Sequence, residues 1–114
     1  MRHWGIKPKY LCRKHLLGAH VECHMLEGTM RCGRNIHNFI KFGLIETHNN
    51  RLFHEQLAEE MKARGYNHND KKILSVLSRR GELNIEANVD ELKFRCEECK
   101  KNFRDLSYKE LSWQ

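Results

Sequence analysis

Apolar residues recur at steps of three and four along two stretches of the 114-residue chain, which is the spacing of one face of an α-helix. In the first stretch we predict a helix from Arg13 to Glu27 that stops at Gly28. Its buried side is expected to consist of Leu16, Ala19, Cys23 and Leu26.

The second stretch, NNRLFHEQLAEEMKARGYN, carries the clearest helix signal. Asn49 or Asn50 is placed to cap its start, and Gly65 stands where a left-handed C-terminal cap belongs. Its apolar positions are Phe53, Leu57 and Met61.

The segments around these two helices are less regular. The first ten residues predict an extended arm, because the residue before Pro8 is disfavoured in a helix. Residues 28–48 predict a loop with a short helix around His37–Phe42.

Beyond residue 69, DKKILSVLSRRG predicts a third helix from Asp70 to about Arg80, closed by Gly81, and the tail from Glu82 predicts one or two short helices. Strand signals are weak throughout. We therefore predict an all-α fold: a compact single domain of about three main helices with an extended N-terminal arm.

Net charge is +6, and the excess of basic residues lies in one part of the chain. Residues 1–68 hold 11 Lys and Arg against 6 Asp and Glu, together with all eight histidines, whereas residues 69–114 hold 10 against 9. A small basic domain is typical of proteins that bind a polyanion, with nucleic acid the first candidate. A solvated surface with a mild basic excess is the alternative interpretation.

No apolar run is long enough to cross a membrane, and the charged start lacks the apolar core of a secretory signal. We therefore expect a cytoplasmic protein with no membrane partner.

Five cysteines are an odd number in such a chain, which argues against a disulfide framework. We predict that Cys12, Cys23 and Cys32 are small buried side chains. Cys96 and Cys99 have the spacing of half a zinc site, but no Cys or His follows them. We interpret them as ordinary cysteines on a helix face, and completion of a zinc site by distant His or Cys residues is the alternative.

The stretch KHLLGAHVECHM combines an acid with several possible metal ligands. His20 and His24 share a helix face, as zinc-binding histidines do, but at about 100° per residue Glu22 points to the opposite side. We therefore predict partly exposed polar histidines here and no metal. Glu22 instead shares its side with His15, and Gly18 lies between them. The glycine indicates either loose packing against a neighbouring helix or a notch through which a substrate reaches Glu22.

Three segments carry a resemblance to a known family. The start MRHW, the helix segment HLLGAHVE and the helix end ARGYNHND resemble, in the same order and at nearly family spacing, the pyrimidine dimer DNA glycosylases. These include the phage endonuclease V type and its small bacterial relatives, which the chain resembles most. The resemblance covers residues 1–70, and residues 71–114 form a C-terminal helical extension of unclear role.

The resemblance implies an all-α enzyme whose nucleophile is the terminal amine, with one glutamate as its partner. Carried over, the catalytic residues are Met1 and Glu22, with His15 as the helix histidine and Arg2 following the amine. Because Arg2 is bulky, we expect Met1 to be retained. An α-amine has a pKa of about 7.7–8.0, against about 10.4 for lysine, so more of it is unprotonated at neutral pH.

The implied function is that of a DNA repair glycosylase with abasic-site lyase activity, acting on double-stranded DNA through a Schiff base. The lesion could be an ultraviolet pyrimidine dimer, another damaged base or an abasic site. The resemblance implies no cofactor, and we expect a monomer. The predicted DNA-binding residues are Arg2, Arg13, Lys14, His15, Arg31 and Arg34.

The chain also departs from the family. Val21 and Met25 stand where phage-type members carry arginines, and Tyr108 and Trp113 match their aromatic C-terminal segment only loosely. Two alternatives therefore stay open: a non-catalytic nucleic-acid-binding module on the same scaffold, and a small zinc-stabilised interaction protein organised around the C-terminal cysteine pair.

Overall fold

Helices are the regular elements of the described residues, which are 1–67, 72–73 and 75–114 of a computed structural model. No strand occurs in this part of the chain, so the all-α prediction is confirmed. In chain order the elements are η1 (Pro8–Tyr10), α1 (Arg13–Arg31), α2 (His37–Lys41), η2 (Thr47–Asn49), α3 (Asn50–Ala63), α4 (Ile85–Arg95), α5 (Glu97–Asn102) and α6 (Tyr108–Leu111), where η denotes a 3-10 helix.

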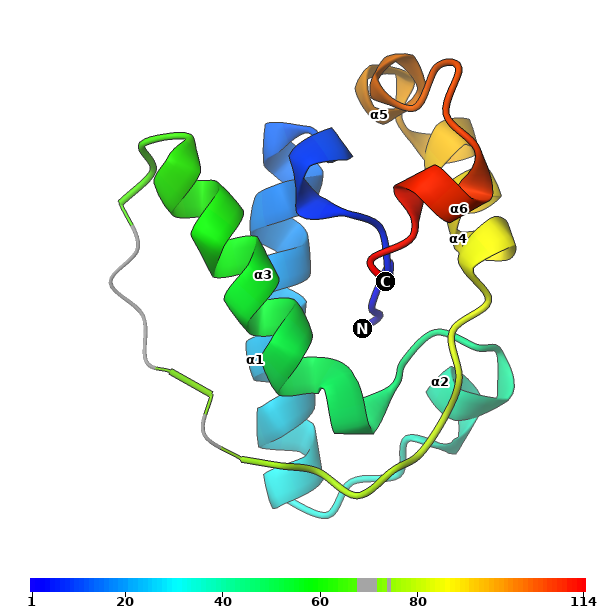
Figure 1. Cartoon of the computed structure of the whole chain (residues 1–114). Coiled ribbons are helices and arrows are strands. Elements are labelled where there is room, and N and C mark those ends of the chain that lie inside the picture. The colour runs from blue at the N-terminus through cyan, green and yellow to red at the C-terminus, as the bar shows by residue number, and fades with distance from the viewer. Residues whose placement is uncertain (68–71, 74) are drawn as a thin grey trace.

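Helices α1 and α3 pack along each other on one side of the molecule (Figure 1). Their facing sides are the apolar stripes predicted from the sequence, which confirms both helices. All the residues predicted to be buried are so: Leu16, Ala19, Cys23 and Leu26 on α1 and Phe53, Leu57 and Met61 on α3. His20 on α1 and Asn50, His54 and Ala58 on α3 are buried as well. The short helix predicted around His37–Phe42 is also confirmed, as α2.

The end of α1 differs from the prediction. Gly28 lies inside the helix, which continues to Arg31. Gly33 adopts the left-handed conformation instead, with a φ of 68°. Its N–H donates to Met30 O and the N–H of the next residue donates to Thr29 O, both at 3.1 Å. These two bonds form a Schellman motif, and they explain why the helix ends here and not at Gly28.

The boundaries of α3 confirm one predicted cap and correct the other. Gly65 follows its C-terminal end with a φ of 79°, as predicted. Asn49 occupies the N-cap position, but its side chain donates to Glu46 Oε2 at 2.8 Å and caps nothing. The side chain of Asn50 donates to Cys23 O at 2.9 Å.

The predicted helix from Asp70 to Arg80 is wrong for its described residues, 72–73 and 75–80, which are not helical; the others lie outside the described residues. The backbone here bonds to a different segment. Thr47 N–H donates to Arg80 O at 3.0 Å, and Arg80 N–H donates to Thr47 Oγ1 at 2.9 Å. A Cβ at Gly81 would collide with Ile45 O, so this glycine allows a close backbone approach and does not close a helix.

The N-terminal arm, residues 1–7, lies between the α1–α3 pair and the C-terminal helices, beside the other end of the chain (Figure 1). Lys7 N–H donates to Leu111 O at 2.8 Å, and Trp113 N–H donates to Gly5 O at 2.9 Å. His3, Trp4 and Ile6 are buried. The arm runs over residues 1–7 and not over the first ten as predicted, because Pro8–Tyr10 form η1. It brings the first residue of the chain against α1.

All five cysteines are free thiols. Cys12 and Cys23 are buried as predicted. Cys32 is exposed, contrary to the prediction, because it follows the last residue of the lengthened α1.

Among the described residues, no helix is both long enough and apolar enough to cross a lipid bilayer.

Candidate functional site

The arm is fixed at its third residue by a buried histidine. The Nδ1 atom of His3 accepts from the N–H of Glu46 at 3.1 Å, so Nε2 carries the proton and donates to Asn50 Oδ1 at 2.8 Å. The backbone N–H of His3 donates to Leu44 O at 2.7 Å. Burial lowers the pKa of His3 to about 4, so this ring is neutral at physiological pH.

Arg2 is held from the C-terminal side of the molecule. Its Nη2 donates to Asn88 Oδ1 at 2.7 Å, and its Cζ lies 3.9 Å from the ring centroid of Trp4. Asn88 in turn donates to the backbone oxygens of His3 and Trp4, at 3.3 and 3.0 Å. One asparagine of α4 therefore fixes both the side chain of Arg2 and the backbone of the arm.

These contacts bring the first amine to the glutamate of α1. The nitrogen of Met1 lies 4.0 Å from Glu22 Oε1. The Met1 side chain is only 6% exposed and packs against the small apolar cluster of Leu26, Ile36 and Ile45, whereas the Glu22 side chain is 26% exposed. The sequence-predicted pair of amine and carboxylate is therefore adjacent, with the carboxylate partly open to solvent.

Burial raises the pKa of Glu22 above its ordinary value. The charges of the Met1 amine and Arg2, a hydrogen bond from the backbone N–H of Arg2 and the charge of Arg95 all oppose this shift. Burial therefore disfavours the charged carboxylate while the neighbouring cations favour it, and burial is the larger effect.

The surface of α1 beside Glu22 is open. No described atom of another element lies within 4 Å of a Cβ built on Gly18, so the first of the two alternatives, loose packing of a neighbouring helix against it, does not occur among the described residues. Val21 and Met25, the positions that are arginine in phage-type members of the resembled family, are 54% and 51% exposed. A substrate can therefore approach the carboxylate over a weakly polar helix surface.

The remaining predicted cations lie at the two ends of α1. Arg13 and Lys14 are exposed at its start, and Arg31 and Arg34 are exposed at or after its end. Arg31 forms an ion pair with Glu27 at 2.6 Å. With a rise of about 1.5 Å per residue, the two ends are about 27 Å apart, so these residues form no common patch.

Arg95 was not predicted, although α4 brings it to the arm. Its Cζ lies 5.8 Å from the ring centroid of Trp4, and its charge acts on Arg2, Glu22 and His15. It lies 2.7 Å from Glu91 Oε1 in an exposed pair. The only sequence signal was a cation beside the CxxC pair, in a segment whose total charge is nearly balanced.

His15 has different neighbours from those predicted for a phosphate contact. Its Nδ1 lies 3.1 Å from Cys12 Sγ and 3.8 Å from Cys99 Sγ. Burial, followed by the charges of Lys14 and Arg95, lowers its pKa. The histidine predicted to bind DNA therefore stands within a group of thiols.

Of the other two histidines of α1, one is more buried than predicted. His20 is only 7% exposed, whereas His24 is partly exposed, as predicted. His20 Nε2 lies 3.1 Å from Nε2 of the buried His54 on α3. Glu22 faces Met1 instead, as expected for the opposite side of the helix.

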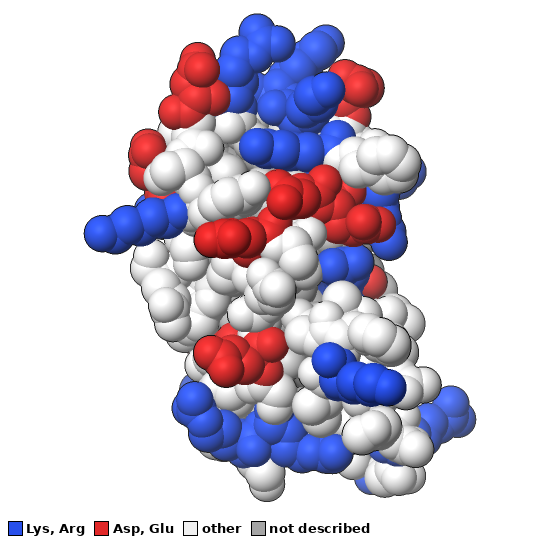
Figure 2. Space-filling model, turned by 90° about the vertical axis from the view of Figure 1, so that its right-hand side faces the viewer, with Lys and Arg blue, Asp and Glu red and all other residues white. Residues whose placement is uncertain are grey.

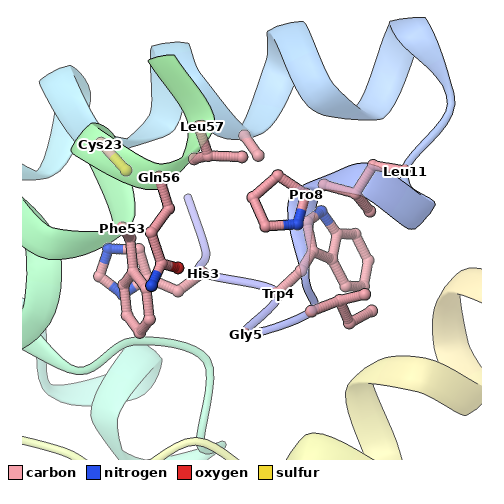
Figure 3. Close-up of a pocket in the computed structure, with 11 residues that line it drawn as sticks. His3, Trp4, Gly5, Pro8, Leu11, Cys23, Phe53, Gln56 and Leu57 are labelled. Atoms are coloured by element: carbon pink, nitrogen blue, oxygen red, sulfur yellow. The ribbon is translucent and has the colours of Figure 1, made fainter. Parts of the chain in front are cut away.

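Among the described residues, neither the enclosed cavity nor the charged face of the C-terminal helices forms a binding site for a nucleotide strand. A cavity of about 20 Å³ lies between the arm, α1 and α3, with Trp4, Phe53 and Gln56 in its wall (Figure 3). It has room for about one water molecule and none for a nucleotide. On the face formed by the C-terminal helices, Lys and Arg gather at the upper and lower ends and Asp and Glu lie between them, so this face is not continuously basic (Figure 2).

Comparison with known proteins gives one match. A family model described as pyrimidine dimer DNA glycosylase matches residues 1–74, which include Met1, Arg2, His15 and Glu22. No curated protein and no solved structure matches the chain.

Proposed function

The chain belongs to the pyrimidine dimer DNA glycosylase family, and from that premise we propose a DNA repair glycosylase with abasic-site lyase activity, carried by the Met1 amine and Glu22. The family indicates a glycosylase with a DNA substrate. The lyase step and the roles of the two groups are our proposal. The observation that supports them is the 4.0 Å separation of Met1 N and Glu22 Oε1 beside an open helix surface.

In the first step, the unprotonated amine of Met1 attacks C1′ of the damaged nucleotide. The glycosidic bond breaks, and the base leaves with the bonding electrons and takes up a proton. The carboxylate of Glu22 stabilises the positive charge that develops on the sugar. Opening of the sugar ring then leaves a protonated imine between C1′ and the amine nitrogen.

In the second step, the imine makes the C2′ proton acidic, and Glu22 assists its removal. The C3′–O bond breaks by β-elimination, and the 3′ phosphate leaves with the electron pair of that bond. Water then hydrolyses the imine and frees the amine. Raised by burial, the pKa of Glu22 suits a carboxyl that accepts and returns protons in this sequence.

Cations around the pair would hold the DNA strand. We assign phosphate contacts to Arg2 and Arg95 beside the amine, and to the cations at each end of α1. A span of about 27 Å corresponds to about eight phosphates of one strand at 3.4 Å each. Such contacts position a duplex without reading its sequence, which suits an enzyme that recognises damage.

The test is covalent capture with borohydride, which reduces the imine to a stable bond. Protein whose intact mass shows a free Met1 amine is incubated with a duplex that contains one abasic site or one pyrimidine dimer. We expect a protein–DNA adduct of stoichiometric mass and strand cleavage. Acetylation of the α-amine and Glu22→Gln should each abolish cleavage.

Glu27→Gln is the matched control, because Glu27 is another glutamate of α1 but pairs with Arg31. Cleavage by this variant should equal that of the parent protein. Absence of any adduct on either substrate would refute the proposal. DNA binding without an adduct, weakened steeply by salt and unchanged by Glu22→Gln, would instead support the non-catalytic binding module.

A further inference from the structure

Four possible metal ligands from distant parts of the chain meet beside the start of α1. They are the side chains of Cys12, His15, Cys96 and Cys99, whose ligand atoms all lie within 4.8 Å of one another. Cys12 and Cys99 are 3% and 0% exposed. The sequence showed the C-terminal pair alone, and the structure supplies a second pair of the same spacing from the N-terminal part.

The two pairs have the same local geometry. Cys12 is the N-cap of α1, and its Sγ accepts from the N–H of His15 at 3.5 Å. Cys96 is the N-cap of α5, and its Sγ accepts from the N–H of Cys99 at 3.4 Å. The N–H of Cys12 also donates to Cys99 Sγ at 3.4 Å. These N–H groups are the outer partners that favour thiolates in a metal site.

The spacing of the four atoms fits a tetrahedral zinc ion. With Zn–S of about 2.3 Å and Zn–N of about 2.0–2.1 Å, tetrahedral angles place two sulfurs about 3.8 Å apart and a sulfur and a nitrogen about 3.6 Å apart. The observed separations are 3.8 Å for Cys12 Sγ to Cys96 Sγ, 3.8 Å for Cys99 Sγ to His15 Nδ1 and 3.1 Å for Cys12 Sγ to His15 Nδ1. Two of these separations agree with the tetrahedral values, and the third is shorter by about 0.5 Å.

We propose that Cys12, His15, Cys96 and Cys99 form a structural zinc site. Three thiolates and one imidazole are a donor set that selects zinc, and four protein ligands leave no open position for catalysis. Three thiolates and Zn²⁺ carry a net charge of −1. The nearby charges are Lys14, Arg95 and Glu98, which together add +1 and offset it.

The site would join the family region to the C-terminal extension. Cys12 and His15 lie within the matched residues 1–74, whereas Cys96 and Cys99 lie beyond them. Cys96 directly follows Arg95, so a metal at this point fixes the end of α4 that carries the arginine next to Trp4 and Arg2. Only this effect on Arg95 rests on the proposed function; the metal site itself does not.

With Nδ1 on the metal, His15 retains only Nε2 for any contact with DNA. Its predicted role as a phosphate ligand would then be secondary to its role as a zinc ligand.

The experiment is metal analysis of the full chain, purified with a reductant and without added zinc. We expect about one zinc ion per chain. Replacement of zinc by Co²⁺ should give the visible absorption of a tetrahedral site and a thiolate-to-cobalt charge-transfer band. Cys99→Ser should lose the metal and unfold at a lower temperature, whereas the control Cys32→Ser, which removes an exposed cysteine outside the cluster, should keep both metal and stability.

Two more variants keep the test decisive. If Cys99→Ser fails to fold, the single variant His15→Cys takes its place in the test. It should form a four-thiolate site and retain zinc in a folded protein. His54→Gln examines the separate histidine group of His20, His24 and His54 and should leave the zinc content unchanged.

Folded parent protein without zinc would overturn the zinc proposal. A mass lower by two hydrogen atoms, which would indicate a Cys12–Cys96 disulfide, would overturn it as well. So would zinc that is lost with His54→Gln but kept with Cys99→Ser. The measurement needs no DNA, so a failure of borohydride trapping leaves it unaffected, and a zinc-free protein that still forms the adduct would refute the zinc site alone.

Discussion

Acidification should loosen the N-terminal arm through His3. This ring is 4% exposed, and its Nδ1 accepts from a backbone N–H. A proton added to Nδ1 would face that N–H and break the hydrogen bond, and the resulting charge would lie in the core without an ionised partner in hydrogen-bond contact. Protonation of His3 is therefore less favourable in the folded protein than in the unfolded chain.

The size of the effect follows from the pKa of His3, which is 6.5 in the unfolded chain and about 4 in the folded protein. Above pH 6.5 both states are neutral, and the stability is fully present. Between 6.5 and 4 the unfolded state binds the proton first, so the free energy of unfolding falls as the pH falls. At about 1.4 kcal/mol per pKa unit, the loss is about 2 kcal/mol by pH 5 and about 3 kcal/mol below pH 4.

The assay is guanidinium unfolding at a series of pH values between 7 and 5, for the parent protein and for His3→Gln. Glutamine retains a donor and an acceptor but does not titrate in this range. We expect the variant to be less stable at pH 7, since it loses the ring contact with Phe53, but to show a pH slope smaller by about 2 kcal/mol over the interval. Equal slopes, or an NMR titration of His3 with a pKa near 6.5, would refute the reasoning.

Three further predictions concern the helix surface and the site. Gly18→Ala and the control Gly28→Ala should each stabilise α1 by about 0.5–1 kcal/mol in thermal unfolding, because both glycines lie inside the helix with open space around them. The larger substitution Gly18→Leu should lower strand cleavage, whereas Gly28→Leu should not. An equal loss of cleavage in both leucine variants would contradict a substrate path over Gly18. Arg95→Ala should weaken binding to abasic duplex about 10-fold, as measured by fluorescence anisotropy. The control Arg51→Ala removes a similar exposed pair with a glutamate and should leave this binding unchanged. Glu22→Gln should unfold at a higher temperature than the parent at pH 7, because burial disfavours the carboxylate, and a lower midpoint would mean that its attraction to the amine outweighs that burial.

The parts of the fold that could be predicted are those set by local sequence. α1 and α3 follow from apolar periodicity, and the cap at Gly65 follows from its place after the last apolar position. The segment before Gly81 has a similar apolar pattern, but its backbone bonds to Thr47, more than 30 residues away along the chain. A tertiary partner of this kind overrides helix propensity, and no local pattern reveals it.

The same distinction applies to the functional residues. Glu22 and Met1 could be paired in advance because a family resemblance carries information about tertiary contact that spacing alone lacks. Arg95 belongs to a segment outside that resemblance, and its approach to Trp4 depends on how α4 docks on the arm. The partners of Cys96 and Cys99 were hidden for the same reason, since Cys12 and His15 lie 84 residues earlier.

Rigid support of the arm would allow the chain end to act as the positioned nucleophile that we propose. Chain ends usually fray, and an amine that samples many positions would lose most of the rate advantage of proximity. Here Asn88 holds the backbone at the third and fourth residues, and the Met1 side chain fills an apolar site, so few rotatable bonds separate the nitrogen from fixed structure. Asn88 lies on α4, beyond the matched residues 1–74, which means that the extension helps to place the amine as well as Arg95. The C-terminal helices therefore act on the proposed chemistry through position, and any weakening of their attachment to α1 should reduce cleavage before it reduces the helical content of the α1–α3 pair.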